Sequence, residues 1–570
     1  MKILRVDMGN LTAEFEPVPE KYEQFGGRGL IAKVLLEEIP PLCEPLGPDN
    51  KLILAPGLMG GTSLSSGGRL SVGGKSPLTG GVKEANAGGT AGIVLGRLEI
   101  KAVIVEGQPA DGGLYQLRIS PDGAALHPAD DLRGLGTYAT AKAARNRWGA
   151  NATVVSIGQA GEYRMAAASV ACTGEGDQDS RQAARGGLGA LMGSKGLKAI
   201  VLDAGSVGPA PLANPDLFKA SARRFGQELF NSPKTGHKGS SHLYGTASIV
   251  GAVNEMGSLP TRNFRDGRFE SAENLRGETL REVTLARGGQ VGTRCMPGCV
   301  IACCNVFVDK GGKPIVGTLQ YETIALLGSN LGLGTLEDVA ELNYICNDLG
   351  LDTIDAGAAL GLAADAGLAE FGNKAGFIAL LGEVAKGSVL GRVVGQGAAV
   401  TGRVLGITRV PVVKGQAMPG YDPRSLKGNG VTYATSPMGA DHTAGNAFGS
   451  RATVNPLGVE GQRAESRKLQ LGAAMLDYTG LCLFARPPVF SDPQLMCDLI
   501  NGRFGWGWTP QDLEAMNKTV LKLELEFNRR AGFTKADDRI PEYMLREPLP
   551  PHNVVFDVPD SEVDGTLADL

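Results

Sequence analysis

Three cysteines, Cys295, Cys299 and Cys303, lie close together in the run RCMPGCVIACCN, with three residues between each pair. Pro297 and Gly298 interrupt any helix there and let the sulfurs converge. Thiolates this crowded, with no His pair nearby, suit a soft metal centre that takes a fourth ligand from elsewhere in the chain. The alternative is a structural zinc site, but its usual second Cys or His pair does not follow. The spacing therefore favours an iron–sulfur cluster over zinc.

Two further side chains could perform acid–base chemistry. Glu322 follows Tyr321 in a largely apolar stretch, LQYETI, and His442 is the single His of the polar loop GADHTAGN. A carboxyl group in an apolar pocket has a raised pKa, which suits a group that acts first as base and then as acid. The ordinary alternatives are a helix-surface acid and a loop His that is satisfied by backbone groups. The residues alone favour these alternatives.

Glycine-rich loops between short β-type runs are the next feature. Glycine exposes backbone N–H groups without side-chain bulk, and basic residues stand among these loops, so together they predict nests for phosphate groups. None has the order of a dinucleotide-binding or P-loop motif. The 83 glycines could also reflect genomic bias, but four such loops in one domain favour a phosphorylated cofactor. The loops are GGRGLIAK, GGRLSVGGKSPLTGG, NAGGTAGIVLGR and ARGGLGALMGSKGLKAI, and their basic residues are Arg69, Lys75, Arg97, Arg185 and Lys195.

Two expected helices end in the same frame. One ends as NDLGLD, from Asn347 through Gly350 to Asp352, and the other as DYTGLC, from Asp477 to Cys482. Gly-Leu after a helix is a common C-terminal cap, so the match by itself is only suggestive. Two helix ends that share one sequence frame predict two sites with similar roles.

The composition bounds the class of protein. A chain of 570 residues with 42% apolar and 20% charged residues predicts a globular protein of two to four domains. The net charge of −4 and the dispersed basic residues argue against a nucleic-acid partner. We find no leader segment and no apolar run of membrane length, and nine cysteines fit reduced thiols and metal ligation. We therefore expect a cytoplasmic protein that does not enter a membrane.

The order of the elements predicts three domains. β-type runs at 51–55, 102–106, 153–157 and 199–202 predict buried strands in residues 1–207. Residues 208–415 turn helical after a Pro-rich boundary, with helices expected to begin at Asn214-Pro215 and Thr335. Residues 416–570 form a third, helical unit whose tail, from Glu547 to Asp564, is expected to be an extended surface strap.

Taken together, these motifs resemble the aldehyde:ferredoxin oxidoreductase family, tungsten or molybdenum enzymes with a bis-pyranopterin cofactor beside a [4Fe-4S] cluster. The resemblance covers essentially the whole chain, and as a set its motifs are highly specific. It implies an α+β fold of three domains, an N-terminal β-rich base for the cofactor and two mainly helical domains that close over it. The motifs are GGRGL, KSPLTGG, RGGLGALMGSK, LPTRNF, the Cys run, the paired helix ends and LPPHNVVFDVP.

The resemblance also assigns roles to residues. Cys482 would complete the cluster with Cys295, Cys299 and Cys303, and the Asn86 side chain and Gly186 carbonyl would bind the Mg²⁺ that bridges the pterin phosphates. The metal itself would be held by dithiolene sulfurs. The cofactor-binding residues implied are Arg69, Lys75, Asn86, Gly88, Arg185, Gly186, Gly187, Asn347, Gly350, Asp352, Asp477 and Leu481.

Glu322, His442 and Tyr321 are the catalytic residues implied, with Glu322 as base and acid and His442 polarising the aldehyde oxygen. The chain departs from the family pattern at three places. The first two cluster cysteines are spaced as in CMPGC, the form of some bacterial relatives; Ala444 stands where several members have Lys, and Asn347 where many have Asp. Cys304, beside Cys303, is assigned as a packed thiol.

The function that follows is tungsten-dependent oxidation of aldehydes to carboxylic acids, or the reverse. Electrons would pass through the cluster to ferredoxin or to an iron–sulfur partner subunit, and a dimer or hetero-oligomer is expected. An aromatic-ring reductase subunit that acts on an aryl thioester of coenzyme A is the nearest alternative, because it has the same cofactor. A zinc-stapled binding protein without catalysis is the alternative of another class.

Overall fold

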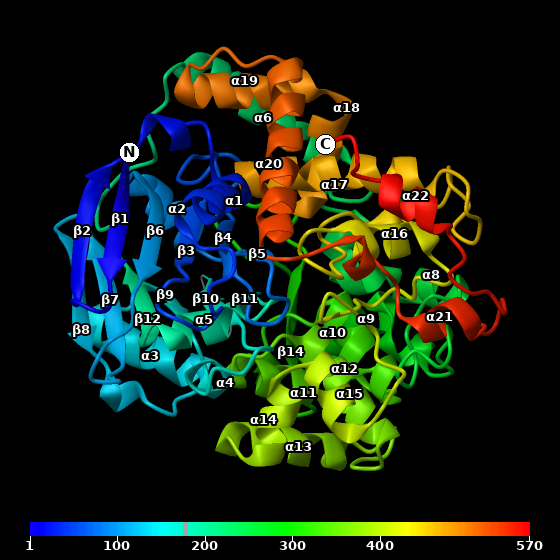
Figure 1. The fold of residues 1–570 in the computed structure, drawn as a ribbon. Helices are drawn as coiled ribbons and strands as arrows, with labels where there is room; N and C mark the ends of the chain where they lie inside the picture. Colours follow the sequence, from blue (N-terminus) through cyan, green and yellow to red (C-terminus); the bar gives the residue numbers. More distant parts are fainter. Residues whose placement is uncertain (175–179) are drawn as a thin grey trace.

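The structure is a computed structural model that describes residues 1–174 and 180–570. Its N-terminal part holds two six-stranded sheets, at the left of Figure 1, and the rest of the chain is mainly helical. The first sheet has the order β2-β1-β6-β3-β4-β5. Its strands are β1 (Lys2–Asp7), β2 (Thr12–Pro17), β3 (Leu52–Pro56), β4 (Leu70–Lys75), β5 (Val82–Ala87) and β6 (Ile100–Glu106).

The second sheet has the order β11-β10-β9-β12-β7-β8 and repeats the first. In both sheets a hairpin comes first, three further strands follow, and the last strand inserts between them. Thus β6 pairs parallel with β1 and antiparallel with β3, as β12 does with β7 and β9. The strands are β7 (Tyr115–Ser120), β8 (Gly123–Pro128), β9 (Thr153–Ser156), β10 (Val170–Thr173), β11 (Ser180–Ala183) and β12 (Leu197–Leu202).

The four predicted buried strands are confirmed as β3, β6, β9 and β12. All residues of β3, β9 and β12 are buried, as expected for strands covered on both faces. The inner faces of both sheets share one apolar core, which includes Leu54, Val103, Val155 and Ile200. The repeat therefore forms a single base of two packed sheets.

Buried lysines mark equivalent positions in the two halves. Lys101 of β6 donates to the Glu23 carbonyl, and Lys198 of β12 donates to the Leu135 carbonyl, each in the loop before the first long helix of its half. Burial lowers the pKa of Lys101 to about 7 and shifts that of Lys198 in the same direction. The helices of this base are α1 (Gly27–Glu38), α2 (Ala91–Arg97), α3 (Thr137–Trp148), α4 (Gln159–Glu162) and α5 (Leu188–Ser194).

The middle region packs around α12, which is nearly all buried because its sequence, TIDAGAALGLAAD, is small and apolar on every face. The predicted helix starts are confirmed: the Asn214 side chain accepts from the Leu217 amide and the Thr335 hydroxyl from the Asp338 amide. The helices are α6 (Pro215–Asn231), α7 (Ser240–Tyr244), α8 (Val250–Glu255), α9 (Gly277–Ala286), α10 (Tyr321–Leu327), α11 (Leu336–Leu349), α12 (Thr353–Asp365), α13 (Lys374–Lys386), α14 (Val389–Gly395) and α15 (Ala398–Leu405).

The C-terminal region returns to the base, where α17 and α20 pack against α1 (Figure 1). Its tail differs in part from the expected strap, because residues 560–565 form a short helix after Pro559. No helix in the described part of the chain combines the length and apolar character that a membrane span requires. The helices are α16 (Lys427–Thr435), α17 (Gln462–Thr479), α18 (Arg486–Ser491), α19 (Pro493–Phe504), α20 (Pro510–Arg530), α21 (Glu542–Arg546) and α22 (Asp560–Gly565).

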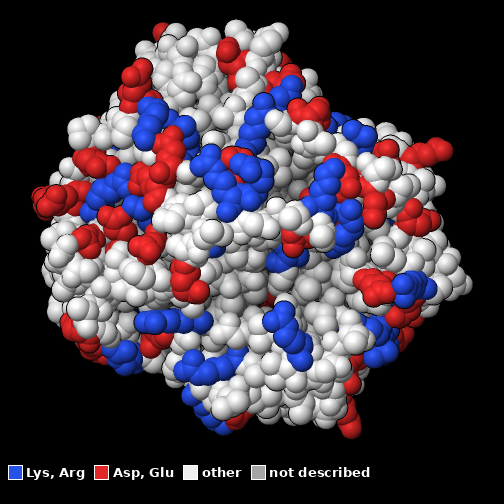
Figure 2. Space-filling view, in the orientation of Figure 1, with Lys and Arg blue, Asp and Glu red and all other residues white. Residues whose placement is uncertain are grey.

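Short strands complete the fold. The Cys run lies mainly in the loop between β13 and β14 of a three-stranded sheet, and Cys304 is the first residue of β14. These strands are β13 (Gln290–Thr293), β14 (Cys304–Val308), β15 (Pro314–Val316), β16 (Val412–Val413) and β17 (Gln416–Ala417). Figure 2 shows basic and acidic side chains interspersed over one face of the molecule.

Candidate active site between the base and the helical domains

The two helix ends of common sequence are held by equivalent parts of the repeated base. Gly57 follows β3 and contacts Gly480 after α17, and Gly158 lies just beyond β9 and contacts Leu349 at the end of α11. A Cβ at Gly57 would lie 2.1 Å from the Gly480 nitrogen, and one at Gly158 would lie 2.3 Å from the Leu349 carbonyl oxygen. Only glycine permits this approach. The repeat thus places the two helix ends by the same means.

Two adjoining cavities lie between these helix ends. The first has a volume of about 290 Å³ and contains thiols on its wall, and the second has about 230 Å³ and mostly polar side chains. They meet at a shared wall that includes the candidate acid–base residues. The residues common to both linings are Arg69, Asn86, Arg181, Gln182, Gln320, Glu322, His442 and Thr443.

The first cavity brings together thiols from distant parts of the chain. Cys295, Cys303 and Cys482 line it, while Cys299 is buried with its Sγ 3.3 Å from the Ser66 hydroxyl. The Ser66 carbonyl in turn accepts from the Cys482 amide at 2.9 Å. This loop of the base therefore connects the Cys run with Cys482, as the predicted four-cysteine set requires.

Cys304, which was predicted to be a packed thiol, is buried. It also lines the first cavity, as Cys295 and Cys303 do. As the first residue of β14, it is directed by the pleat of the strand to the face opposite its neighbour Asn305. Among the described residues, no three His, Cys, Asp or Glu side chains converge closely enough to hold one metal ion.

The end of α11 supplies part of the second cavity. Asn347, Leu351 and Asp352 line it, and Gly350 adopts the left-handed conformation at φ 72° that ends the helix. Asp352 caps α12 through the Ile354 amide at 3.0 Å and accepts from Arg185 Nε at 3.2 Å. The predicted Asn347, Asp352 and Arg185 therefore lie at one cavity.

The end of α17 supplies the corresponding part of the first cavity. Asp477 lines it and accepts from Asn86 Nδ2 at 2.9 Å and from Arg28 Nη1 at 3.1 Å. Burial raises the pKa of Asp477 to about 6, although Arg28 acts in the opposite direction. Leu481 is buried, and its amide donates to the Leu476 carbonyl at 2.9 Å. Arg69 donates through Nη2 to the Asn86 carbonyl at 3.0 Å.

Glu322 and His442 face one another at the wall shared by the cavities. Glu322 Oε1 lies 3.4 Å from His442 Nε2, and Glu322 Oε2 accepts from the Gly420 amide at 2.7 Å. Burial raises the pKa of Glu322, as predicted for a carboxyl group in a pocket. Within the described residues, neither Glu322 Oε1 nor His442 Nδ1 has a hydrogen-bond partner. Two buried polar atoms are thus available to a bound group.

Tyr321 does not present a free hydroxyl group. Its side chain lines the first cavity, but the hydroxyl donates to the Gly420 carbonyl. Because Gly420 also donates to Glu322, Tyr321 fixes the backbone that holds the carboxylate. The catalytic role of Tyr321 stays a prediction, and this contact favours a positioning role.

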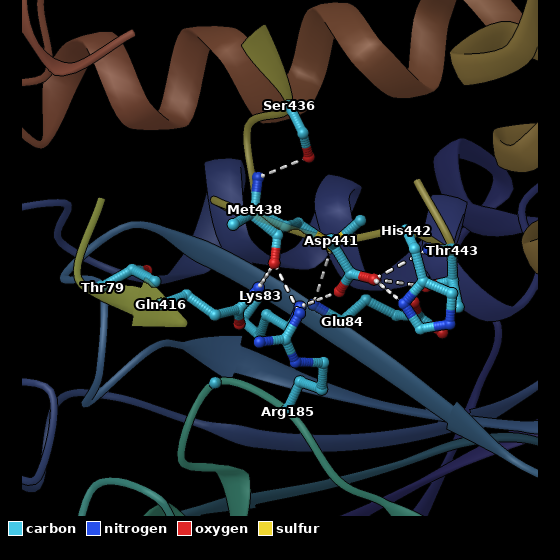
Figure 3. A network of polar contacts seen from close by, with 12 residues as sticks. Thr79, Lys83, Glu84, Arg185, Gln416, Ser436, Met438, Asp441, His442 and Thr443 are labelled. Carbon is cyan, nitrogen blue, oxygen red and sulfur yellow. Dashed lines mark hydrogen bonds and ion pairs between the residues drawn. The ribbon is translucent and has the colours of Figure 1, made fainter. Parts of the chain in front are cut away.

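A charged network lies behind His442, and Figure 3 shows it from close by. Lys83 of β5 donates to Asp441 Oδ2 at 2.7 Å, and Thr443 donates through its amide to Asp441 Oδ1 at 2.9 Å. Burial alone would raise the pKa of Asp441, but the Lys83 and Arg185 cations hold it well below its usual value. The base thereby fixes the loop that carries His442.

Four other predicted cofactor residues have different positions. Gly88 lines the first cavity beside Cys295. Gly186 and Gly187 line neither of the two cavities, and the Gly186 carbonyl accepts from Ser76 Oγ at 2.7 Å. Lys75 lines neither of the two cavities, and its ammonium donates to the Pro41 and Cys43 carbonyls at 2.6 and 2.7 Å.

Several lining residues were missed by the sequence analysis. Arg181 and Gln182 come from the edge strand β11, and Gln320 and Thr443 are neighbours of predicted catalytic residues. Adjacency to a candidate residue is the signal that could have identified the last two. Lys83 was missed as well, because its role depends on a partner 358 positions away in sequence.

Two family models together match most of this chain. The family model described as "Aldehyde ferredoxin oxidoreductase, N-terminal domain" matches residues 3–204, and that of "domains 2 & 3" matches residues 221–567. The "Tungsten-containing aldehyde ferredoxin oxidoreductase" of Thermococcus kodakarensis is 32% identical over 96% of this chain and 92% of its own length. The protein of that name from Pyrococcus furiosus is 31% identical with the same coverage.

Two more distant proteins are also similar. The "Aliphatic sulfonate oxidoreductase, WOR-like subunit" of Pyrococcus furiosus is 26% identical over 96% of this chain and 89% of its own length. A solved structure of the "Active site complex BamBC of Benzoyl Coenzyme A reductase in complex with 1,5 Dienoyl-CoA" has a TM-score of 0.80 at 20% identity, covering 95% of this chain and 90% of the other. At that identity the likeness shows the fold alone.

Proposed function

Because the chain belongs to the aldehyde ferredoxin oxidoreductase family, we propose that it oxidises aldehydes to carboxylic acids with a tungsten bis-pyranopterin cofactor. It is an oxidoreductase of the tungsten class, with the α+β architecture of that family. The observation that carries the finer proposal is the Glu322–His442 pair, with 3.4 Å between its facing atoms, at the junction of a thiol-lined and a polar cavity.

The donor sets of the two cavities fit such a cofactor. Thiols on one wall suit iron, and amide, guanidinium and carboxylate groups on the others suit a polar, phosphorylated organic chelate. Cys295, Cys299, Cys303 and Cys482 would hold the [4Fe-4S] cluster. Arg69, Asn86, Arg185, Asn347, Asp352 and Asp477, with the Gly88, Gly350 and Leu481 backbone, would hold the pterins.

The Mg²⁺ site is part of the proposal. The Asn86 side-chain oxygen accepts from Arg69, and the Gly186 carbonyl accepts from Ser76. Each oxygen retains a further lone pair, and oxygen ligands suit Mg²⁺. Gly187 would contribute its backbone beside Gly186.

Aldehyde oxidation consumes water and releases two protons and two electrons with each carboxylic acid formed. The tungsten centre, when bound, supplies the two-electron acceptor. Glu322 accepts a proton from the attacking oxygen, and because burial raises its pKa, its carboxylate is a stronger base than an exposed one. His442 donates a hydrogen bond to the aldehyde oxygen and polarises the carbonyl group. The first cavity and its aromatic wall, which includes Tyr421 and Phe448, bind and orient the substrate.

The electrons would leave singly through the cluster to ferredoxin or an iron–sulfur partner subunit, in a cytoplasmic dimer or hetero-oligomer. A ring reductase subunit acting on a coenzyme A thioester is the second candidate, and the shared fold of the benzoyl coenzyme A reductase complex is what favours it. The 31–32% identity to aldehyde oxidoreductases over nearly the whole chain supports the first.

Two measurements on protein purified without oxygen test the proposal. Metal analysis should find tungsten or molybdenum near one atom per chain with about four iron atoms, as a four-cysteine cluster requires. Aldehydes should then reduce a viologen dye, while benzoyl coenzyme A should not be reduced by reduced viologen. Zinc as the sole metal would contradict the cofactor, and reduction of the thioester without aldehyde oxidation would contradict the substrate.

A further inference from the structure

The outer part of the first cavity carries a group of cations that the proposed chemistry does not use. Lys234, in the loop after α6, and Arg486, the first residue of α18, both line this cavity. Among the described residues, the structure gives neither side chain a hydrogen bond or an ion pair, and Lys234 has only the Phe484 ring, 5.9 Å from its Nζ. We call this pair the cationic rim.

The cationic rim lies beyond the aromatic wall from the catalytic pair. The Tyr421 ring is 6.2 Å from the His442 ring and 6.0 Å from the Phe448 ring. The Arg486 guanidinium in turn approaches Gly449, next to Phe448, where a Cβ would lie 3.1 Å from Nη2. The wall therefore runs from His442 through aromatic rings to a positive charge.

The surroundings leave this charge uncompensated. Glu465 is the acid that acts on Arg486, but its carboxylate accepts from the Ser450 hydroxyl at 2.6 Å and pairs with Lys468 at 3.5 Å. Arg451 adds a third cation nearby, with its guanidinium 4.0 Å from the Phe448 ring centroid. Burial lowers the pKa of Arg486, and Tyr421 and Glu465, which act in the opposite direction, do not offset this effect.

From this arrangement we propose that the enzyme takes aldehydes that carry an anionic group, held by Lys234 and Arg486 while the aldehyde end lies at Glu322 and His442. The proposal rests on the function proposed above and adds the substrate class. A guanidinium binds a carboxylate through two parallel hydrogen bonds, and an aromatic wall suits an aryl spacer between the two ends. A planar aryl aldehyde with a carboxylate opposite the aldehyde has this chemistry.

The test compares two aldehydes of similar shape, anionic 4-formylbenzoate and neutral 4-acetylbenzaldehyde, with the holoenzyme and a viologen acceptor. The kcat/KM value should favour the anion by about ten- to a hundredfold, the effect of a charge-assisted hydrogen bond at a partly desolvated site. Arg486→Gln should remove most of this preference and Lys234→Gln part of it, whereas Arg486→Lys should keep part of it.

Lys238→Gln is the matched control, because Lys238 lies in the same loop as Lys234 but does not line the cavity. It should leave the preference within about twofold, because Lys238 does not line the cavity in which the anionic group would bind. Equal kcat/KM values for the two aldehydes in the wild-type enzyme, or a preference that both cavity variants retain, would overturn the proposal.

Binding of the unreactive dianion terephthalate, measured by calorimetry, separates this proposal from the proposed function. Binding that Arg486→Gln abolishes supports the cationic rim even if no aldehyde is oxidised, and absent binding contradicts it. Free coenzyme A, which also carries anionic phosphates, is the competing ligand. Tighter binding of coenzyme A than of terephthalate, lost in Lys234→Gln, would assign the rim to a thioester substrate instead and overturn the proposal.

Discussion

Replacing Glu322 by Gln isolates the proton-transfer step. The amide has nearly the shape of the carboxylate, and its oxygen can still accept from the Gly420 amide, which lies 2.7 Å from Glu322 Oε2. What it loses is the group that faces His442 and exchanges a proton. Loss of a positioned general base lowers turnover by about 10²- to 10⁴-fold, or about 3–5 kcal/mol of transition-state stabilisation.

The folded protein should tolerate this change. Burial raises the pKa of Glu322, so the ionised carboxylate is less favourable in the folded protein than in the unfolded chain. A neutral Gln avoids that cost, and the thermal midpoint should stay the same or rise. In the wild-type enzyme, kcat/KM should increase as pH rises through the raised pKa of Glu322, because the base must be deprotonated. The residual kcat/KM of Glu322→Gln should not show this increase with pH.

The assay is anaerobic oxidation of an aldehyde with a viologen acceptor, together with tungsten and iron analysis of the same samples. Glu341→Gln is the control, because Glu341 is partly exposed, pairs with Lys374 and lines neither cavity. Activity within tenfold of wild type in Glu322→Gln would refute the role of Glu322 as base. Loss of tungsten together with activity would show that Glu322 holds the cofactor instead.

Three further predictions follow from other parts of the structure. Lys83→Met should destabilise the protein by about 3–5 kcal/mol, because Asp441 loses its buried partner. Lys83→Met combined with Asp441→Asn should destabilise it by less than the sum of the two single variants. Additive losses of unfolding free energy, measured by denaturation, would contradict the coupling between Lys83 and Asp441. Cys482→Ser should lower the iron content, whereas Cys497→Ser, at a buried cysteine outside both cavities, should not; equal iron in the two would exclude Cys482 as a ligand. Lys101 has a pKa of about 7 in the folded protein, compared with the ordinary value of 10.5 for an unfolded chain. Between these pH values the unfolded chain binds a proton that the folded protein does not. The free energy of unfolding should therefore rise with pH between these values by up to about 1.4 kcal/mol per pH unit, and Lys101→Met should reduce this slope; an unchanged slope would contradict the burial effect.

Local sequence patterns predicted much of the fold because they act over a few residues. Continuous apolar runs gave β3, β6, β9 and β12, and capping residues gave the starts of α6 and α11. The repeat in the base was missed, because its two halves share strand order and buried lysines rather than an obvious period in sequence. Its consequence, the matched support of two helix ends, is visible only in three dimensions.

The candidate site shows the same division. Five predicted residues that lie in distinctive local motifs all line the two cavities. They are Glu322, His442, Asn347, Asp352 and Asp477. The Lys75 ammonium and the Tyr321 hydroxyl donate to backbone carbonyls, and these contacts depend on distant segments that no local pattern predicts.

By itself, the sequence determined which residues are chemically suited to the site. These are the crowded thiols, a carboxylate in an apolar stretch and two helix ends that share one sequence frame. Those properties reside in residue types and short spacings. Only the tertiary structure decided which of these groups meet, because the contacts are made by residues hundreds of positions apart. Lys83 holds the loop of His442, and Ser66 joins the Cys run to Cys482. Lys234 and Arg486 line one cavity wall because α6 and α18 pack together, and no local pattern encodes that packing.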